Sequence, residues 1–331
     1  MSAVRPLASL SLDLDNLWSY LKTHGDPGWE ARPTYLPEVV PAALDLLEDL
    51  RFRITVFVVG VDAEREENAE ALRSIPARGH EVGNHSHEHE PWLHLYAPGQ
   101  LSEEIERAEQ AVTAATGQRP SGFRGPGYSW SPELLRILRG RDYLFDSSTL
   151  PTYIGPLARA YYFATARLSA EAKAERKALF GTVKDGLRPV GPYTWQLGAE
   201  GGLLEIPVTT MPGLKLPFHL SYLLYLSRYS EALAAGYLRT ALRACRSAGV
   251  EPSFLLHPLD LVGGDAVPGL SFFPGMDLPT ARKQRIARRM LTLLGERFKV
   301  VNMSTHARAI LARGGLARRR AVGMTPRSVE A

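Results

Sequence analysis

Five of the nine histidines of this chain fall close together in the sequence, at His80, His85, His87, His89 and His94. His85 and His89 stand four residues apart, just beyond a strand-like run. If the chain forms a helical turn there, both rings face one side and can hold a divalent metal ion, while His87 points elsewhere. A solvated polar loop is the alternative, but Gly83 and Asn84 immediately before the pair favour a built site.

Two aspartates end the first strand-like run of the chain, in the segment SLSLDLDNLW. Asp13 and Asp15 are two residues apart, so in a strand both carboxylates point to the same face. Two histidines do not complete a metal site, and a hard third ligand is expected. We therefore expect one carboxylate to bind the cation and the other to stay available as a base. An acidic strand end that only caps the next helix is the alternative.

Two further polar residues follow apolar runs. The segment FRGPGYSW contains Arg124, and an arginine beside two aspartates can fix a carboxylate by paired hydrogen bonds. The segment SFLLHPLD places His257 after a continuous apolar run. A lone histidine there is more often structural, but at the end of a barrel strand it becomes a candidate general acid.

Strand-like runs alternate with amphipathic helical runs along most of the chain. The expected strands are Leu7–Leu14, Arg53–Gly60, His80–Ser86, Gly122–Pro126, Tyr143–Ser147, Leu203–Val208, Ser253–His257 and Lys299–Met303. The expected helices are Leu36–Leu50, Glu64–Ile75, Leu101–Thr116, Pro132–Gly140, Glu231–Ala248 and Pro279–Phe298. Repeated strand–helix alternation over 331 residues predicts an α/β fold with a parallel sheet, of the size of a (β/α) barrel.

We expect one catalytic barrel over residues 1–313, with an aromatic and basic insertion at about 150–200. The insertion and the apolar stretch Pro212–Tyr229 form either a lobe that faces lipid or glycan, or plain helical packing over the barrel. Residues 314–331 are rich in arginine and are expected to form a flexible tail. Such a tail on an otherwise nearly neutral body favours peripheral contact with an anionic membrane.

Composition excludes several classes of protein. Hydrophobic residues make up 45% and charged residues 22%, as in folded globular proteins. The single cysteine, Cys245, excludes a disulfide scaffold and a cysteine-based zinc site. The first residues resemble no signal peptide and no apolar run has membrane-spanning length, so we expect a cytoplasmic protein that contacts the inner face of the membrane at most peripherally. No nucleic-acid-binding module is recognisable, and the oligomeric state stays open.

Taken in order, these elements resemble the polysaccharide deacetylase (NodB-homology) family, carbohydrate esterase family 4, over roughly Leu7 to Ser304. HSHEH matches the family's His-Ser/Thr-x-x-His box, Arg124 lies in an Arg-x-Pro box, and His257 lies in a Leu-x-His box. The aspartate spacing is similar to the family's Asp-x-Asp branch. The resemblance implies a distorted (β/α)7 barrel, here with an inserted helical and aromatic lobe, and metal-dependent hydrolysis of N-acyl groups on amino sugars.

The resemblance also implies roles for individual residues. Asp13 is the base, Arg124 its partner and His257 the general acid, while the metal ligands are Asp15, His85 and His89. The substrate-binding residues implied are Gly127, whose N–H stabilises the oxyanion, Tyr128, Leu255 in the acyl pocket, and Asp146 and Trp195, which match the family's Asp–Trp box poorly. One divalent ion is expected, with Zn²⁺ preferred and Co²⁺, Mn²⁺ or Ni²⁺ as alternatives.

The function expected is therefore carbohydrate N-deacetylation, by a hydrolase acting on a carbon–nitrogen bond other than a peptide bond. The substrate class is a polysaccharide or a glycan precursor, including phosphorylated or lipid-linked precursors. A cyclic amidase on the same barrel and a non-catalytic glycan- or lipid-binding protein are the alternatives. Two histidines and a carboxylate also bind Fe(II) in non-haem oxygenases, but the strand–helix alternation opposes that class.

Overall fold

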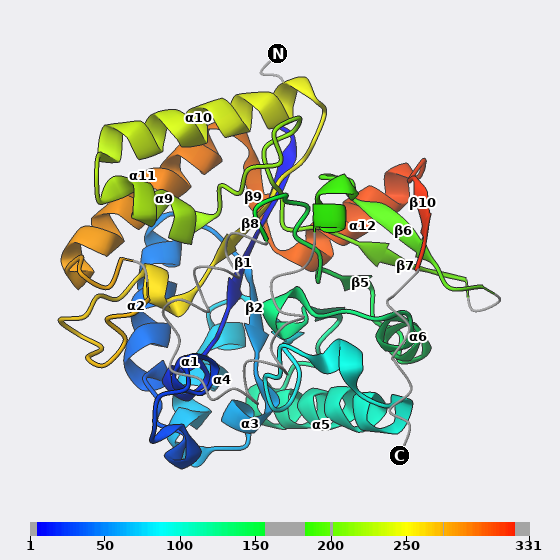
Figure 1. Ribbon diagram of the computed structural model, residues 1–331, viewed down its shortest axis with the longest axis horizontal. Coiled ribbons are helices and arrows are strands. Elements are labelled where there is room, and N and C mark those ends of the chain that lie inside the picture. The colour runs from blue at the N-terminus through cyan, green and yellow to red at the C-terminus, as the bar shows by residue number, and fades with distance from the viewer. Residues whose placement is uncertain (1–4, 156–182, 199–200, 274, 322–331) are drawn as a thin grey trace.

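The computed structural model describes residues 5–155, 183–198, 201–273 and 275–321, which share one ten-stranded sheet (Figure 1). In spatial order its strands are β10 (Arg318–Arg320), β6 (Tyr193–Gln196), β7 (Gly202–Glu205), β5 (Phe145–Asp146), β4 (Gly122–Phe123), β3 (Glu81–Asn84), β2 (Thr55–Val58), β1 (Leu7–Asp13) and β8 (Ser253–Leu256), and β9 (Lys299–Val301) also pairs with β1. All of these pairings are parallel except that of β6 with β7. The predicted parallel α/β fold is confirmed.

The segment after β7 connects the two ends of the seven-strand series that runs from β8 through β1 to β7. Among the described residues no ladder pairs β7 with β8. Instead, the Thr209 N–H donates to the Ser253 carbonyl at 3.0 Å, and the Ser253 N–H donates to Thr209 Oγ1 at 2.9 Å. These bonds link the segment after β7 to the first residue of β8, which is the arrangement of a distorted barrel that is open along one seam.

The helices surround this sheet. They are α1 (Leu17–His24), α2 (Leu36–Asp49), α3 (Gly60–Ala63), α4 (Ala69–Ala77), α5 (Pro98–Thr116), α6 (Pro132–Gly140), α9 (Leu220–Ser227), α10 (Glu231–Ser247), α11 (Thr280–Arg297) and α12 (Met303–Arg313). In Figure 1, α2, α9, α10 and α11 lie to the left of β1, and α5 and α6 lie at the lower right. The carboxyl ends of the parallel strands are therefore left for the loops that carry the site.

The alternation of residues along β1 explains its two faces. Ala8, Leu10 and Leu12 are buried in the main hydrophobic core. The residues between them are polar, and both Ser11 and Asp13 accept hydrogen bonds from a single guanidinium inside the barrel. Because successive side chains in a strand point to opposite faces, the same seven residues supply the core outside and the polar wall inside.

Several elements lie outside the predicted set, namely β6, β10, α1, α3, α9 and α12. Within the segment 314–331, for which a flexible tail was predicted, Arg318–Arg320 form β10 and pair in parallel with β6. Backbone pairing needs no apolar side chain, and all three arginines remain exposed at the edge of the sheet. Residues 322–331 lie outside the described residues, as do residues 156–182 and 199–200 of the expected insertion.

None of the described helices is both long enough and apolar enough to cross a membrane.

Gly83 in β3 provides a test of how tightly the barrel interior is packed. A Cβ at this position would lie 2.4 Å from Cδ1 of Phe57 on the neighbouring strand, and Phe57 is fully buried. We expect Gly83→Ala to lower the free energy of unfolding by about 1–3 kcal/mol through overpacking.

The control is Gly236→Ala, an exposed position in α10 with nothing within 4 Å. Since alanine is the better helix former, the control should raise the free energy of unfolding by up to about 1 kcal/mol. Urea denaturation measures both, and equal stability of the two variants would contradict the packing described.

Candidate metal centre and active site

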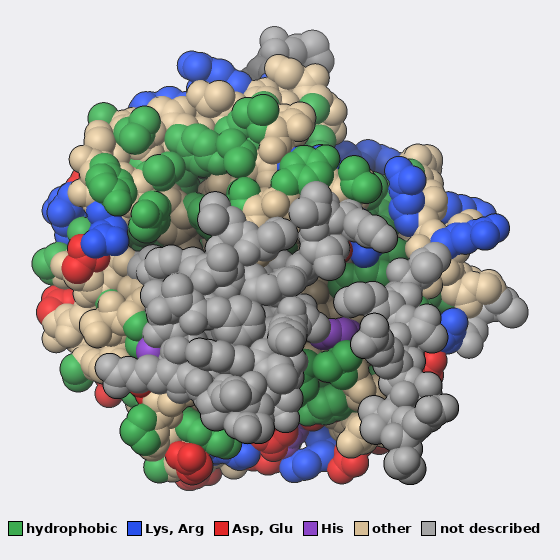
Figure 2. Space-filling view, viewed as in Figure 1, with side chains coloured by type: hydrophobic (Ala, Val, Ile, Leu, Met, Phe, Trp, Pro, Cys, Tyr) green, Lys and Arg blue, Asp and Glu red, His purple; other side chains and the backbone are tan. Residues whose placement is uncertain are grey.

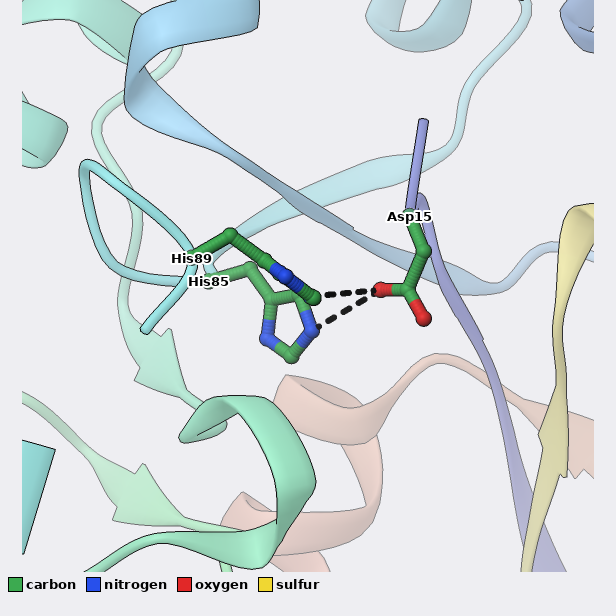
Figure 3. A group of neighbouring side chains, drawn as sticks. All are labelled: Asp15, His85 and His89. Carbon is green, nitrogen blue, oxygen red and sulfur yellow. Dashed lines mark hydrogen bonds and ion pairs between the residues drawn. The ribbon is translucent and has the colours of Figure 1, made fainter. Parts of the chain in front are cut away.

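Three side chains from two loops converge at the carboxyl ends of β1 and β3 (Figure 3). Oδ1 of Asp15 lies 3.2 Å from Nε2 of His85 and 3.0 Å from Nε2 of His89. One ligand atom from each residue lies within 4.8 Å of the other two. Two imidazole nitrogens and a carboxylate oxygen at this spacing are a donor set that suits a divalent transition-metal ion.

The loop that carries His85 and His89 does not form the helical turn that the sequence analysis considered. Its backbone bends through left-handed conformations at Ser86 (φ 62°) and His89 (φ 53°). The Ser86 N–H donates to the side chain of Asn84, and the His87 N–H donates to Glu104 on α5. Side chains therefore satisfy the backbone of the loop, and this holds a conformation that non-glycine residues seldom adopt.

The orientation of His85 is set by a carbonyl on the neighbouring strand. Its Nδ1–H donates to the backbone oxygen of Arg124 at 2.6 Å, which directs Nε2 toward Asp15. Such a bond fixes the tautomer with a free lone pair at the other nitrogen, as a metal-binding histidine requires. The ligand group thus fits a metal in chemistry as well as in spacing.

Charge inside the cluster favours ionised Asp15. Burial by itself would raise the pKa of this carboxyl, but the neighbouring rings of His89 and His85 hold the pKa well below its ordinary value. An ionised carboxylate beside two imidazoles is the protonation state in which the group binds a cation.

Asp13 lies beside this cluster and is held by a buried arginine. Nη1 of Arg124 donates to Oδ1 of Asp13 at 2.6 Å and to Oγ of Ser11 at 2.8 Å. Nε and Nη2 donate to the carbonyl and hydroxyl of Ser147 at 3.1 and 2.8 Å. The guanidinium has no exposed surface and lies 4.4 Å from the ring of Phe57. A charge-assisted hydrogen bond from Arg124 therefore fixes the Asp13 carboxylate, which is not one of the three residues of the ligand group.

His257, at the end of β8, is the second ionisable group with a fixed orientation. Its Nδ1 lies 3.2 Å from Oγ of Ser221 and 3.8 Å from Oδ2 of Asp260, which also accepts the His257 backbone N–H at 2.8 Å. Burial opposes its protonation, but Asp260, Asp15 and Asp13 raise the pKa of His257 to about 9. The ring is protonated at neutral pH and can donate a proton. Asp260 was missed from the sequence, although its place three residues after His257 was a usable signal.

The other predicted substrate-binding residues lie at different positions around the site. Gly127 is exposed and has a left-handed backbone, with φ of 58°, in the turn Pro126–Tyr128. Burial raises the pKa of the Tyr128 hydroxyl and the charge of Asp13 adds to that shift, so the hydroxyl is a neutral group. Leu255 is fully buried inside the barrel, where it pairs with Ser11.

Asp146 and Trp195, which were predicted as substrate contacts, lie in the interior of the described structure. Both are buried, at 0% and 1% exposure, and they belong to a cluster around Glu205 on β7. Nε1 of Trp195 donates to Glu205 at 3.0 Å, and burial raises the pKa of both Asp146 and Glu205. A carboxyl pair of this kind is stable inside a protein because one member keeps its proton. It supports the wall of the barrel and presents no surface to a ligand.

The comparisons with known proteins agree with this architecture. Residues 26–144 match the family model for polysaccharide deacetylase. A chitooligosaccharide deacetylase of Bradyrhizobium is 33% identical over 100 residues, which is 30% of this chain and 44% of that protein. A peptidoglycan deacetylase of Helicobacter pylori is 25% identical over 201 residues, or 58% of this chain and 66% of that protein. The matches thus span about half to two thirds of these curated relatives.

A crystal structure of a Mycobacterium smegmatis protein assigned to the polysaccharide deacetylases has the same fold. It aligns with a TM-score of 0.61 at 20% identity and covers 97% of this chain and 99% of that one. Over residues 26–144 this chain is similar to the polysaccharide deacetylase family, which its sequence motifs also resemble, and its fold is that of a solved structure assigned to those deacetylases.

The environment of His257 generates a prediction for the metal-free protein. We expect its imidazole to titrate near pH 9 in NMR spectra, and we expect Asp260→Asn to lower that pKa because it removes the nearest negative charge. The control is Glu231→Gln. Glu231 on α10 pairs with Arg282 on α11, so this change should leave the titration of His257 unchanged. A wild-type pKa near 6.5 would contradict the arrangement.

The same group makes stability depend on pH. The pKa of His257 is higher in the folded chain, at about 9, than in the unfolded chain, at about 6.5. Its contribution to the free energy of unfolding is therefore complete below pH 6.5 and is lost as the pH rises to about 9. Urea denaturation across this range should show a smaller loss for Asp260→Asn than for the wild type.

Proposed function

We propose that this protein is a metal-dependent hydrolase that removes an N-acyl group, by preference N-acetyl, from an amino sugar. One observation carries the proposal. A carboxylate oriented by a buried arginine, a three-residue ligand group and a protonated histidine meet at one end of the barrel. These are the base, the electrophile site and the acid that amide hydrolysis requires.

Asp15, His85 and His89 would hold the cation. When bound, a divalent ion such as Zn²⁺ supplies Lewis acidity and lowers the pKa of water; Co²⁺, Mn²⁺ and Ni²⁺ are alternatives. The ligand group itself would supply one negative charge and two neutral imidazoles, so a dication keeps a net positive charge at this site.

The remaining residues carry out the proton transfers and the binding of the developing charge. Asp13, oriented by Arg124, accepts a proton from the attacking water. The N–H of Gly127 donates to the oxyanion of the tetrahedral intermediate, while the Tyr128 N–H already donates to the Gly125 carbonyl. His257 then donates its proton to the leaving nitrogen as the carbon–nitrogen bond breaks, and Asp260 stabilises its charged form before that step.

The substrate class follows from the family and from one surface. The relatives named above are deacetylases of chitooligosaccharide and peptidoglycan, so a glycan is the proposed substrate. A phosphorylated or lipid-linked precursor is the form we favour. Figure 2 shows hydrophobic side chains gathered over α9 and α10, where Tyr229 and Leu233 are 72% and 56% exposed. Exposed apolar groups on this surface suit a substrate that is presented at a membrane.

A cyclic amidase would use the same base, metal and acid. Product analysis separates the two reactions, because deacetylation releases acetate from a sugar whereas a cyclic amide opens without losing a fragment. The non-catalytic alternative predicts that no N-acetylated glycan is turned over by protein loaded with metal.

The ligand group predicts which substitutions abolish metal retention. We expect about one divalent ion per chain in wild-type protein by mass spectrometry and none in His85→Ala or His89→Ala, because two ligands do not retain a cation. His94→Gln is the control from the same segment, since its ring contacts Ser129 and lies outside the ligand group. Metal retained in both alanine variants would contradict the assignment.

The base assignment predicts a variant that separates metal binding from turnover. Asp13→Asn keeps the shape of the side chain, so we expect a full complement of metal with kcat reduced by about 10²–10⁴-fold, the usual contribution of a general base. Acetate release from N-acetylglucosamine oligomers and from an N-acetylated sugar phosphate measures it. Wild-type turnover in Asp13→Asn would rule out Asp13 as the base.

The apolar surface predicts binding to membranes. In flotation with anionic vesicles at low salt, we expect wild-type protein to float and the double variant Tyr229→Ser/Leu233→Ser to float less, because burial of these side chains in lipid is lost. Leu311→Ser, at a 45% exposed position on α12, is the matched control and should float like the wild type. Absence of wild-type flotation would count against a membrane-presented substrate and leave deacetylation untouched.

A further inference from the structure

The four-residue helix α3, which follows β2, contacts both loops that carry the proposed metal ligands. The Gly60 N–H donates to the Ser86 carbonyl at 2.9 Å. The Val61 N–H donates to the His87 carbonyl at 3.0 Å. Both carbonyls belong to the loop between the two histidines of the ligand group, so the backbone of α3 holds that loop in place.

The side chain of Asp62, the third residue of α3, holds the loop that carries Asp15. Oδ1 of Asp62 accepts hydrogen bonds from Nδ2 of Asn16 at 2.8 Å and from Nε1 of Trp18 at 2.9 Å. Asn16 directly follows Asp15, and its own Oδ1 accepts the Tyr35 N–H at 3.2 Å. The Tyr35 hydroxyl donates to the Asp15 carbonyl. The Asp62 carboxylate therefore restrains the backbone on which Asp15 stands.

Trp18 connects the same carboxylate to a second ligand. Its ring lies edge-on to the His89 ring, with the two centroids 6.3 Å apart and the planes at 80°. The hydrogen bond to Asp62 fixes the orientation of the buried indole, and the indole in turn limits the positions open to the His89 ring. Asp62 thus acts on a ligand from each of the two loops.

Asp62 is a costly residue for packing alone. Its side chain is fully buried, and within the described part of the chain its Oδ2 has no hydrogen-bond partner. Burial raises the pKa of the carboxyl to about 6, while the hydrogen bonds from Asn16 and Trp18 oppose that rise, so the group is ionised at neutral pH. A buried charge with one bonded oxygen lowers the free energy of unfolding. An apolar side chain would serve the fold better here, and this favours a role in the site.

We propose that Asp62 is a positioning residue for the metal centre, which fixes the Asp15 loop against the histidine loop and so sets the distances among the three ligand atoms. The inference rests on the proposed function, because it takes Asp15, His85 and His89 as the ligands. These ligand atoms lie within 4.8 Å of one another, and α3 is bonded to both of the loops that present them. Hydrogen bonds of this kind behind the ligands typically contribute about 10- to 100-fold to metal affinity.

The test is the affinity of the metal-free chain for Co²⁺, measured by calorimetry and by visible absorption. We expect Asp62→Leu to raise the Kd for Co²⁺ by about 10- to 100-fold and to change the absorption bands, which report the ligand geometry. Asp62→Asn keeps the size of the side chain and one acceptor oxygen, so its Kd should lie between those of Asp62→Leu and the wild type. Because it conserves shape, Asp62→Asn is also the variant to measure if Asp62→Leu does not fold.

A glycine variant tests the contact of α3 with the histidine loop. A Cβ at Gly60 would lie 2.7 Å from Cδ2 of His87 and 2.8 Å from Cα of Ala108 on α5. Gly60→Ala should therefore push the histidine loop away from α3 and raise the Kd for Co²⁺, although it leaves the Asp62 side chain intact.

Leu238→Ala is the control for a general loss of stability. Leu238 is fully buried on α10 in the main hydrophobic core, so its truncation should lower the Tm. Helix α10 carries no residue of the ligand group and none that bonds to Asp62, so the Kd for Co²⁺ should stay at the wild-type value. All affinities are measured well below the lowest Tm of the series.

The outcomes are distinguishable. Wild-type affinity and absorption in Asp62→Leu, or in Asp62→Asn if only that variant folds, overturn the role of Asp62 and leave the ligand group standing. An equal loss of affinity in Leu238→Ala also overturns it, because destabilisation would then explain the effect. If the wild type binds neither Co²⁺ nor Zn²⁺, the inference and the proposed function fail together.

Discussion

The buried guanidinium of Arg124 is the interaction on which the site depends. A charge without exposed surface is tolerated only when its donors are satisfied, and here Ser11, Asp13 and Ser147 accept from it. The same residue accepts a hydrogen bond from His85 through its carbonyl. One side chain on the loop after β4 therefore fixes the proposed base, and its backbone fixes a proposed ligand. Arg124 therefore sets the spacing between the Asp13 carboxylate and the His85 ring.

Differences in local charge give similar residues different chemistry. His257 and His219 are neighbours, yet the pKa of the first is raised to about 9 and that of the second is lowered to about 3. Burial lowers the pKa of both rings. Asp260 contacts the His257 ring and more than offsets the effect of burial there, whereas no described group hydrogen-bonds the ring nitrogens of His219. Proton donation is therefore proposed for His257 and not for its neighbour.

The barrel supports this arrangement without a continuous ladder around its circumference. The segment after β7 reaches β8 through two hydrogen bonds at Thr209, and the first turn of α9 follows shortly after it in the chain. An open seam leaves room for α9 to bring Ser221 and His219 to the mouth of the barrel. In a fully paired strand at this position, the backbone N–H and C=O groups would instead form hydrogen bonds with the neighbouring strands.

The sequence by itself predicted the strand–helix alternation and, through its resemblance to a known family, the six candidate residues Asp13, Asp15, His85, His89, Arg124 and His257. Their place near strand ends was readable because the carboxyl ends of parallel strands lie at one edge of a sheet. Asp146 and Trp195 match the family's Asp–Trp box poorly, and the structure places both beside the buried Glu205. Only the tertiary structure decided that Asp260 and Ser221 orient His257 and that His219 stands beside it, since burial and charge at a site are sums over segments distant in the chain.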